Sequence, residues 1–274
     1  MERRMLTTQR IDQINRIENG RLDISIYTDQ EVFEEELQRI FYRTWMYVGH
    51  ESEIESQGDY LTTYIGRIPV IVSRDETDQI HVLINRCAHR GPTVCQQESG
   101  NANFFRCEYH GWVYANDGSL AGVSLRRGFG PGEIDDIQGG LDKAPRVATY
   151  RGLIFASLSE DGPTLEQHLG MARKYIDMWA DVSPTGNLAV GRTGYWKHVY
   201  IGNWKLQVEG SNEGYHVGYM HRITGLVADV VLRSRGNPGR VRSASFEGGG
   251  NRQLHVNDLE LGNRGLDLGN GHSI

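Results

Sequence analysis

Apolar residues recur at helical spacing near the N-terminus. The segment Thr28-Asp29-Gln30-Glu31 has the form of a capping box, with Thr28 as the N-cap and Glu31 at the third helical position. The apolar positions that follow at a spacing of three to four residues are Phe33, Leu37, Ile40 and Phe41. This pattern predicts a helix that begins after Thr28 and buries an aromatic stripe.

The pattern changes between residues 46 and 158. Short runs rich in β-branched residues lie at 60–65, 69–73 and 79–84, and turn residues separate them. A further run at 150–158 has the same character. Such short runs between turn signals predict an antiparallel β domain, with 150–158 as its last strand.

Helical spacing returns near Thr164, which forms a second capping box with Gln167. We expect this helix to end before Pro184 and strands to resume at 188–191 and 195–201. A third helix is expected to start near Asn203. Helices and strands therefore mix in the second half of the chain, and the fold class expected is α+β.

Composition excludes several classes of protein. The chain has 274 residues, a net charge of −6 and no run approaching the roughly 20 apolar residues of a membrane span. The acidic balance argues against a nucleic-acid partner. The N-terminus has no apolar stretch typical of a secretory signal, so a cytoplasmic location is expected. Three cysteines do not make a disulfide framework and point to metal or thiol chemistry instead.

Two of those cysteines belong to mixed pairs with histidine. Cys87 and His89 form the first pair, and Cys107 and His110 form the second, with 17 residues between the pairs. Two metal groups suit two cysteines and two histidines: a tetrahedral zinc ion, or a [2Fe–2S] cluster with the cysteines on one iron and the histidines on the other. Mixed pairs favour the cluster, because a common zinc finger groups its cysteines first. Cys95 is expected to be a small buried residue.

A second group of metal-binding side chains lies at 209–221. Its members are Glu209, Glu213, His216 and His221. Two imidazoles near carboxylates suit a ferrous site with two histidines and one carboxylate. The two histidines are five positions apart in the sequence, so an ideal helix would place them about 140° apart around its axis. We therefore expect the helix to be interrupted between them, near Gly218.

Both segments resemble one family. The first resembles the Rieske motif Cys-x-His, about 17 residues, Cys-x-x-His, and Gly111-Trp112 also matches its form in oxygenases. The stretch 202–221 resembles the signature Asn-Trp-Lys-x-x-x-Glu-Asn-x-x-Asp-x-Tyr-His-x-x-x-x-His of Rieske non-haem iron oxygenases. The chain is thereby similar to the large (α) subunit of aromatic-ring-hydroxylating dioxygenases. The resemblance implies a cluster on Cys87, His89, Cys107 and His110, Fe²⁺ on His216 and His221, and Glu213 as the electron-transfer bridge.

The same resemblance implies a domain plan and partners. It implies a helical segment at 1–45 that packs on the catalytic domain, a Rieske domain at 46–158, and part of the catalytic domain at 159–274. A reductase and a ferredoxin would supply electrons for hydroxylation of an aromatic ring, of an aromatic acid by preference, with O₂. A trimer of such chains with a small β subunit is also implied. The alternative is a Rieske electron-transfer protein without oxygenase activity.

The sequence departs from the family pattern at three points. Glu213 replaces the bridging aspartate, and Gly210 replaces an asparagine. The family's third iron ligand lies well over a hundred residues beyond the second histidine, whereas this chain ends 53 residues after His221. The tail carboxylates Asp258, Glu260 and Asp267 match no family position. We therefore expect a C-terminally truncated chain that is inactive for lack of this ligand.

Overall fold

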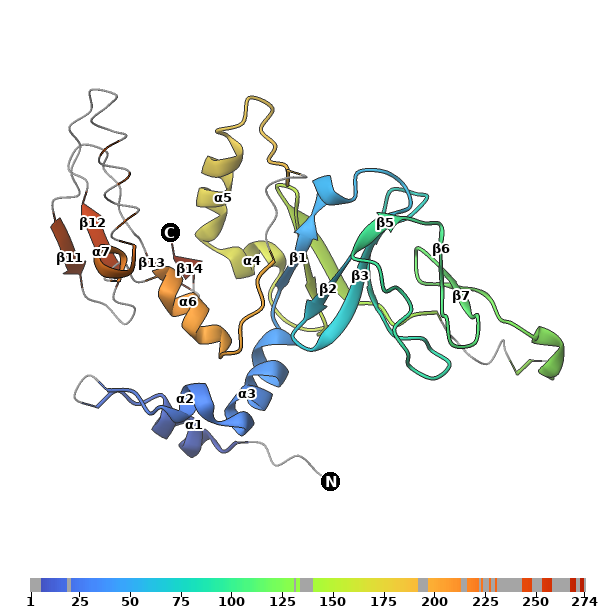
Figure 1. The fold of residues 1–274 in the computed structure, drawn as a ribbon, viewed down its shortest axis with the longest axis horizontal. Coiled ribbons are helices and arrows are strands. Elements are labelled where there is room, and N and C mark those ends of the chain that lie inside the picture. Colours follow the sequence, from blue (N-terminus) through green and yellow to red (C-terminus); the bar gives the residue numbers. More distant parts are fainter. Residues whose placement is uncertain are drawn as a thin grey trace.

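The computed structural model has an N-terminal helical part, a β domain and a C-terminal part of helices and hairpins (Figure 1). It describes residues 6–18, 21–130, 132–133, 140–191, 197–212, 216–221, 223, 227, 230, 243–247, 253–257, 267–269 and 272–273. Antiparallel sheets and helices occur together, so the α+β prediction is confirmed. Among the described residues, no helix has the length and apolar character needed to cross a membrane.

The N-terminal part consists of α1 (Thr8–Ile14), α2 (Ser25–Thr28) and α3 (Gln30–Glu36). Asp29 caps α3, and its carboxylate accepts a hydrogen bond from the Glu31 amide at 2.9 Å. The prediction of Thr28 as the N-cap was wrong by one residue. Thr28 is already helical within α2, and its hydroxyl donates to the Ile24 carbonyl at 3.2 Å, so it does not reach forward to α3.

A π-helical turn (η1, Leu37–Phe41) continues α3, where the sequence predicted a regular helix. The Tyr42 amide donates to the Leu37 carbonyl, five residues back, at 3.0 Å. The Phe41 ring packs edge-on against Trp204, with 5.2 Å between centroids. Tyr42 packs instead over Gly66, where a Cβ atom would lie 2.8 Å from its ring. The wider turn thus lets adjacent aromatic residues serve two different contacts.

Three antiparallel sheets build the β domain. The first has the order β4-β3-β2-β5, from Ile80–Ile84, Ile68–Arg74, Asp59–Ile65 and Ser99–Asn101. The second has the order β1-β10-β9, from Met46–His50, Leu153–Ser157 and Arg146–Tyr150. The third has the order β6-β7-β8, from Phe104–Arg106, Val113–Ala115 and Leu120–Gly122.

The strands predicted at 60–65, 69–73 and 79–84 correspond to β2, β3 and β4, and the antiparallel arrangement is confirmed. The single strand predicted at 150–158 is wrong at its start. Tyr150 ends β9, the chain reverses at Arg151-Gly152, and only then does β10 begin. Gly152 has φ of +84°, which allows the tight reversal that the apolar pattern alone does not reveal.

The C-terminal part begins with the predicted capping box. Thr164 and Gln167 exchange side-chain to backbone hydrogen bonds at 3.0 and 3.2 Å. One continuous helix was predicted, but α4 (Leu165–Leu169) stops at Gly170, which has φ of +50°, and α5 runs from Ala172 to Ala180. The left-handed glycine ends α4 because it turns the backbone out of the helical path.

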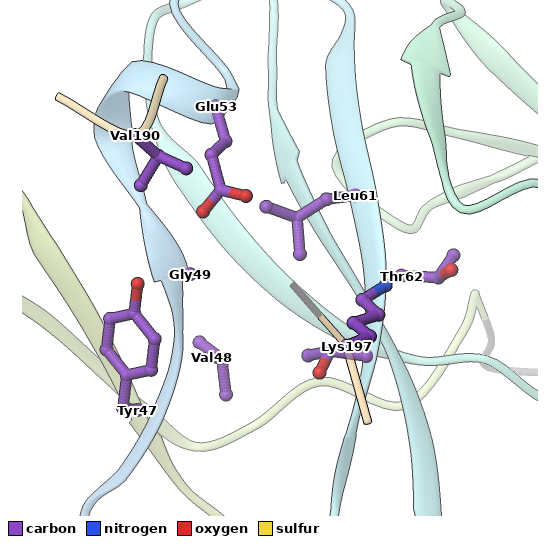
Figure 2. Close-up of a pocket in the computed structure, with 9 residues that line it drawn as sticks. Tyr47, Val48, Gly49, Glu53, Leu61, Thr62, Val190 and Lys197 are labelled. Atoms are coloured by element: carbon purple, nitrogen blue, oxygen red, sulfur yellow. The ribbon is translucent and has the colours of Figure 1, made fainter. Parts of the chain in front are cut away.

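The strands predicted at 188–191 and 195–201 are absent from the described residues 187–191 and 197–201. Within the described ranges no strand pairs with these residues, and the side chains of Val199 and Ile201 are fully exposed. The Val190 amide donates instead to the Ser52 hydroxyl at 2.9 Å. Val190 and Lys197 line a cavity of about 270 Å³ beside β1 and β2 (Figure 2).

The third predicted helix is confirmed as α6 (Trp204–Asn212), and a single turn, α7 (Val217–Met220), follows it. Farther along, β11 (Ser243–Glu247) pairs with β12 (Gln253–Asn257), and β13 (Asp267–Gly269) pairs with β14 (His272–Ser273).

Candidate metal centres

Two loops of the β domain have the same backbone structure. In the first, the Cys87 amide donates to the Pro92 carbonyl, and the Gly91 amide donates to the Cys87 carbonyl, both at 2.8 Å. The loop that begins at Cys107 repeats both bonds, to Trp112 and from Gly111, at 2.8 and 2.9 Å. Gly91 and Gly111 have φ of +80° and +71°, the left-handed conformation that this turn requires. The mixed Cys/His pairs thus lie on a duplicated loop.

The loops bring the four predicted cluster residues together. Cys87 and Cys107 are free, buried thiols within hydrogen-bonding reach of each other. The rings of His89 and His110 lie 4.6 Å apart between centroids. One side of the site therefore presents two sulfurs and the other two imidazoles.

Tyr114 on β7 supports one of the sulfurs. Its hydroxyl oxygen accepts from the Ala88 amide at 3.1 Å and lies 3.1 Å from the Cys87 Sγ. Because the amide uses an oxygen lone pair, the hydroxyl hydrogen is available to the sulfur. Burial and the adjacent Cys87 raise the pKa of Tyr114, so it stays a donor. Sequence reasoning missed Tyr114, although its position two residues after Trp112 placed it close to the loop.

Backbone amides complete the surroundings of both sulfurs. The amides of His89 and Arg90 point to Cys87, and those of Tyr109 and His110 point to Cys107. Burial acts to raise the pKa of both thiols. At Cys87 the Tyr114 hydroxyl and the amides overcome it and lower the thiol pKa, whereas at Cys107 burial prevails and the pKa is raised.

The imidazoles are suited to metal binding. Trp112 stacks on His89, with 4.8 Å between ring centroids and a 4° angle between planes. The His89 Nδ1 atom is buried and has no hydrogen-bond partner within the described structure. Burial and the neighbouring His110 lower the pKa of His89, which keeps the ring neutral. A neutral, unpartnered ring nitrogen beside two thiols fits the donor set of a Cys₂His₂ [2Fe–2S] cluster.

Cys95 is buried, as expected, in the apolar core that also contains Cys87 and Cys107. Burial raises the pKa of its thiol, so it stays protonated and unreactive.

At the second predicted metal site, the structure describes the two histidines. His216 and His221 lie on either side of α7, and their rings are 5.2 Å apart between centroids. The expected interruption at Gly218 was wrong, because Gly218 lies within α7. The helix is only four residues long, so its two ends bring the flanking rings together without a break between them.

The carboxylates predicted near this centre are placed elsewhere or lie outside the description. The Glu209 carboxylate accepts a hydrogen bond from the Tyr27 hydroxyl at 2.6 Å. Glu213, Asp258 and Glu260 lie outside the described residues, and Asp267 is described only as part of β13. Across the described ranges, no three side chains of His, Cys, Asp or Glu lie close enough to hold a single metal ion.

The segment that carries both loops matches a known protein family. The sequence profile of the Rieske [2Fe-2S] domain matches residues 44–129, which contain both loops and all four donor residues. The chain contains a Rieske domain. Its cofactor is therefore a [2Fe–2S] cluster, and the cluster fits the thiol pair and imidazole pair of the two loops.

The rest of the chain is related to oxygenases that carry this domain. It is 41% identical over 227 residues to toluate 1,2-dioxygenase subunit alpha of Pseudomonas putida, a match that covers 82% of the chain and 50% of that protein. It is 37% identical over 261 residues to the anthranilate 1,2-dioxygenase large subunit of Acinetobacter baylyi, over 93% and 53% of the two chains. The chain is thus a homologue of dioxygenase alpha subunits and spans about half the length of these relatives.

Solved structures give the same relationship. Naphthalene 1,2-dioxygenase from Rhodococcus sp., with indole bound, matches with a TM-score of 0.67 and 35% identity. That match covers 84% of this chain and 51% of the dioxygenase chain. The Rieske domain and the region that follows it therefore share their fold with a ring dioxygenase.

Proposed function

We propose that the chain belongs to the terminal oxygenase component of a multicomponent system that hydroxylates an aromatic ring. The observation that carries this proposal is the presence of two separate donor sets in one chain, the duplicated loops at 87–112 and the facing pair His216 and His221. An electron carrier needs only the first. The homology to dioxygenase alpha subunits extends through both and supports the same function.

Each donor set has its own task in this proposal. A bound cluster would supply one-electron transfer, and an Fe²⁺ ion would supply O₂ activation. Cys87 and Cys107 would hold one iron of the cluster, and His89 and His110 the other. His216 and His221 would bind the Fe²⁺ ion through neutral imidazoles. Glu213 would bridge an iron-ligand histidine of its own chain to the cluster histidine of a neighbouring chain in the trimer, by hydrogen bonds that also orient its histidine partners.

The surroundings of the cluster loops are arranged for electron transfer rather than for substrate. Tyr114 and the loop amides donate toward the sulfurs and so favour negative charge there. The stacked Trp112 covers one face of His89 and limits water on that side. The Tyr109 side chain is 61% exposed beside His110 and leaves the cluster edge open to a partner protein.

The proposal extends to partners, location and substrate class. We infer a cytoplasmic protein that receives electrons from a reductase, directly or through a ferredoxin, and that assembles as a trimer of such chains with a small β subunit. The substrate class is an aromatic acid, which two relatives support, since one is a toluate and the other an anthranilate dioxygenase. The proposed domain plan has an N-terminal helical segment at 1–45, the Rieske domain at 46–158 and part of the catalytic domain at 159–274.

Fe²⁺ binding by the cluster-loaded protein tests the proposal. The parent chain is expected to bind Fe²⁺ in addition to the cluster, and the replacements His216→Ala and His221→Ala should each weaken that binding and leave the visible spectrum unchanged. Reversible cluster reduction without any Fe²⁺ binding that depends on His216 would instead identify an electron carrier.

A further inference from the structure

The Asn-Trp-Lys segment at the start of α6 is held by the N-terminal helices. The Asn203 side-chain amide donates to the Tyr27 carbonyl at 3.0 Å. The Trp204 indole N–H donates to one oxygen of Glu36 at 2.8 Å, and the Lys205 ammonium group pairs with the other at 2.5 Å. Two residues of the N-terminal helices thus engage all three side chains.

The contact continues along α6. The Tyr27 hydroxyl donates to Glu209 at 2.6 Å, and this bond raises the pKa of Tyr27 to about 12. The Phe41 ring packs edge-on against Trp204. The first two turns of α6 are therefore fixed to a segment that precedes them by more than 160 residues.

The same N-terminal segment, α3 with η1 (residues 30–41), also contacts the Rieske domain. Arg67, in the turn between β2 and β3, pairs with Glu34 at 2.6 Å and lies over the Phe33 ring at 5.0 Å. The next residue back, Gly66, leaves room for Leu37, because a Cβ atom there would lie 2.9 Å from its side chain. Figure 1 shows α3 below both α6 and the lower ends of the β strands. We call residues 30–41 the brace.

Three consecutive glutamates of the brace have three different partners. Glu34 pairs with Arg67 of the Rieske domain, and Glu35 pairs with Arg39 within the brace itself. Glu36 is directed to α6, where its side chain and that of Lys205 are 11% and 13% exposed. Removal of this carboxylate would leave the Lys205 cation poorly solvated and unpaired, which is costly at a nearly buried position.

We propose that Glu36 is a positioning residue, which fixes α6, and through it the His216–His221 pair, relative to the Rieske domain. This inference rests on the proposed function in one respect, namely that the two histidines bind Fe²⁺. It assigns a role to the Asn-Trp-Lys segment, which contributes none of the proposed metal ligands. α6 ends at Asn212, only four positions before His216, so fixing the start of α6 restricts where the chain enters the histidine pair.

Hydrogen–deuterium exchange of the cluster-loaded full chain tests the anchoring. Glu36→Gln should accelerate exchange of the α6 amides roughly tenfold, because a charged hydrogen-bond partner is lost. Amides of the central strand β3 should keep the parent's protection. Glu31→Gln is the matched control, since it makes the same charge change on an exposed side chain of the same helix and should leave α6 unchanged.

Fe²⁺ binding tests the positioning. Glu36→Gln should weaken it roughly tenfold, as loss of outer-shell support does, while Glu31→Gln and the visible spectrum of the cluster stay as in the parent. Adding Lys205→Met should restore part of the α6 protection, because the unpaired cation is then absent. Such partial rescue is not expected if Glu36 only adds bulk to the fold.

The possible failures are distinct. Unchanged α6 exchange in Glu36→Gln overturns the anchoring, and so does an equal acceleration in β3, which would show a global effect. Equal Fe²⁺ affinity in the parent and Glu36→Gln overturns the positioning. A parent chain that binds no Fe²⁺ besides its cluster refutes the proposed function at His216 and His221, while α6 exchange still decides whether Glu36 anchors the helix.

Discussion

Replacement of Tyr114 by phenylalanine should lower the reduction potential of the Rieske cluster. The side chain is fully buried, and its hydroxyl lies 3.1 Å from the Cys87 Sγ. A hydrogen bond to sulfur is strongest when the cluster carries more negative charge, which is its reduced state. The substitution removes that hydrogen bond and keeps the aromatic ring, so it leaves only a small cavity in place of the hydroxyl group.

The magnitude follows from the strength of one such bond. A hydrogen bond to a charged group contributes about 1.5–3 kcal/mol in total. If about 1–2 kcal/mol of this distinguishes the reduced from the oxidised state, the potential falls by about 40–90 mV, since 59 mV corresponds to a tenfold change for one electron. The Ala88 amide also loses its acceptor, which lowers stability but does not reverse the sign.

A redox titration followed by the EPR signal of the reduced cluster measures this shift. Tyr109→Phe is the control, because the Tyr109 side chain is 61% exposed and packs on His110 rather than against a sulfur. Its potential should stay close to the parent's. A change of less than about 15 mV in Tyr114→Phe would refute the view that this hydroxyl donates to Cys87.

Four further predictions concern the cluster and the stability of the β domain. Cys107→Ser should abolish the visible absorbance of the protein, because a thiolate ligand is lost, and an absorption spectrum tests this. His110→Cys should keep a cluster with a lower reduction potential, which a redox titration measures. Hydrogen bonds from His81, Thr77 and Gln79 lower the pKa of Asp75, so its carboxylate should stabilise the fold above about pH 4 and lose this effect as the pH falls. Asp75→Asn should therefore lower the free energy of unfolding in urea by about 1–3 kcal/mol at pH 7 and by less at pH 3. An equal loss at both pH values would contradict this prediction. Gly152→Ala should destabilise the chain in the same assay, because a Cβ atom there would clash with the His50 ring and φ is +84°.

Local chemistry was predictable from the sequence where it depends on residue type and spacing. The cluster loops were of this kind, because Cys and His at fixed offsets define the donor set. The capping box at Thr164 and the strands β2 to β4 were predicted for the same reason, since their signals lie within a few residues.

Features that depend on distant partners were not predictable. Tyr114 approaches Cys87 across 27 residues, and Tyr27 meets Glu209 across 182. The short apolar run at 188–191 predicted a strand, but a strand forms only beside another strand. The turn at Arg151-Gly152 and the left-handed Gly170 could not be predicted for a similar reason. The φ angle of a glycine is set by the elements on both sides of it, and the local sequence does not reveal it.

Analysis of iron and inorganic sulfide, together with the EPR spectrum of the reduced protein, tests the central claim most directly. The account predicts two irons and two sulfides per chain held by the loops at 87–112, with nitrogen couplings from two histidines and a potential above that of an all-cysteine cluster. Those couplings should vanish together with the normal spectrum in Cys107→Ser. A colourless protein that binds one zinc ion per chain through the same four residues would contradict the account.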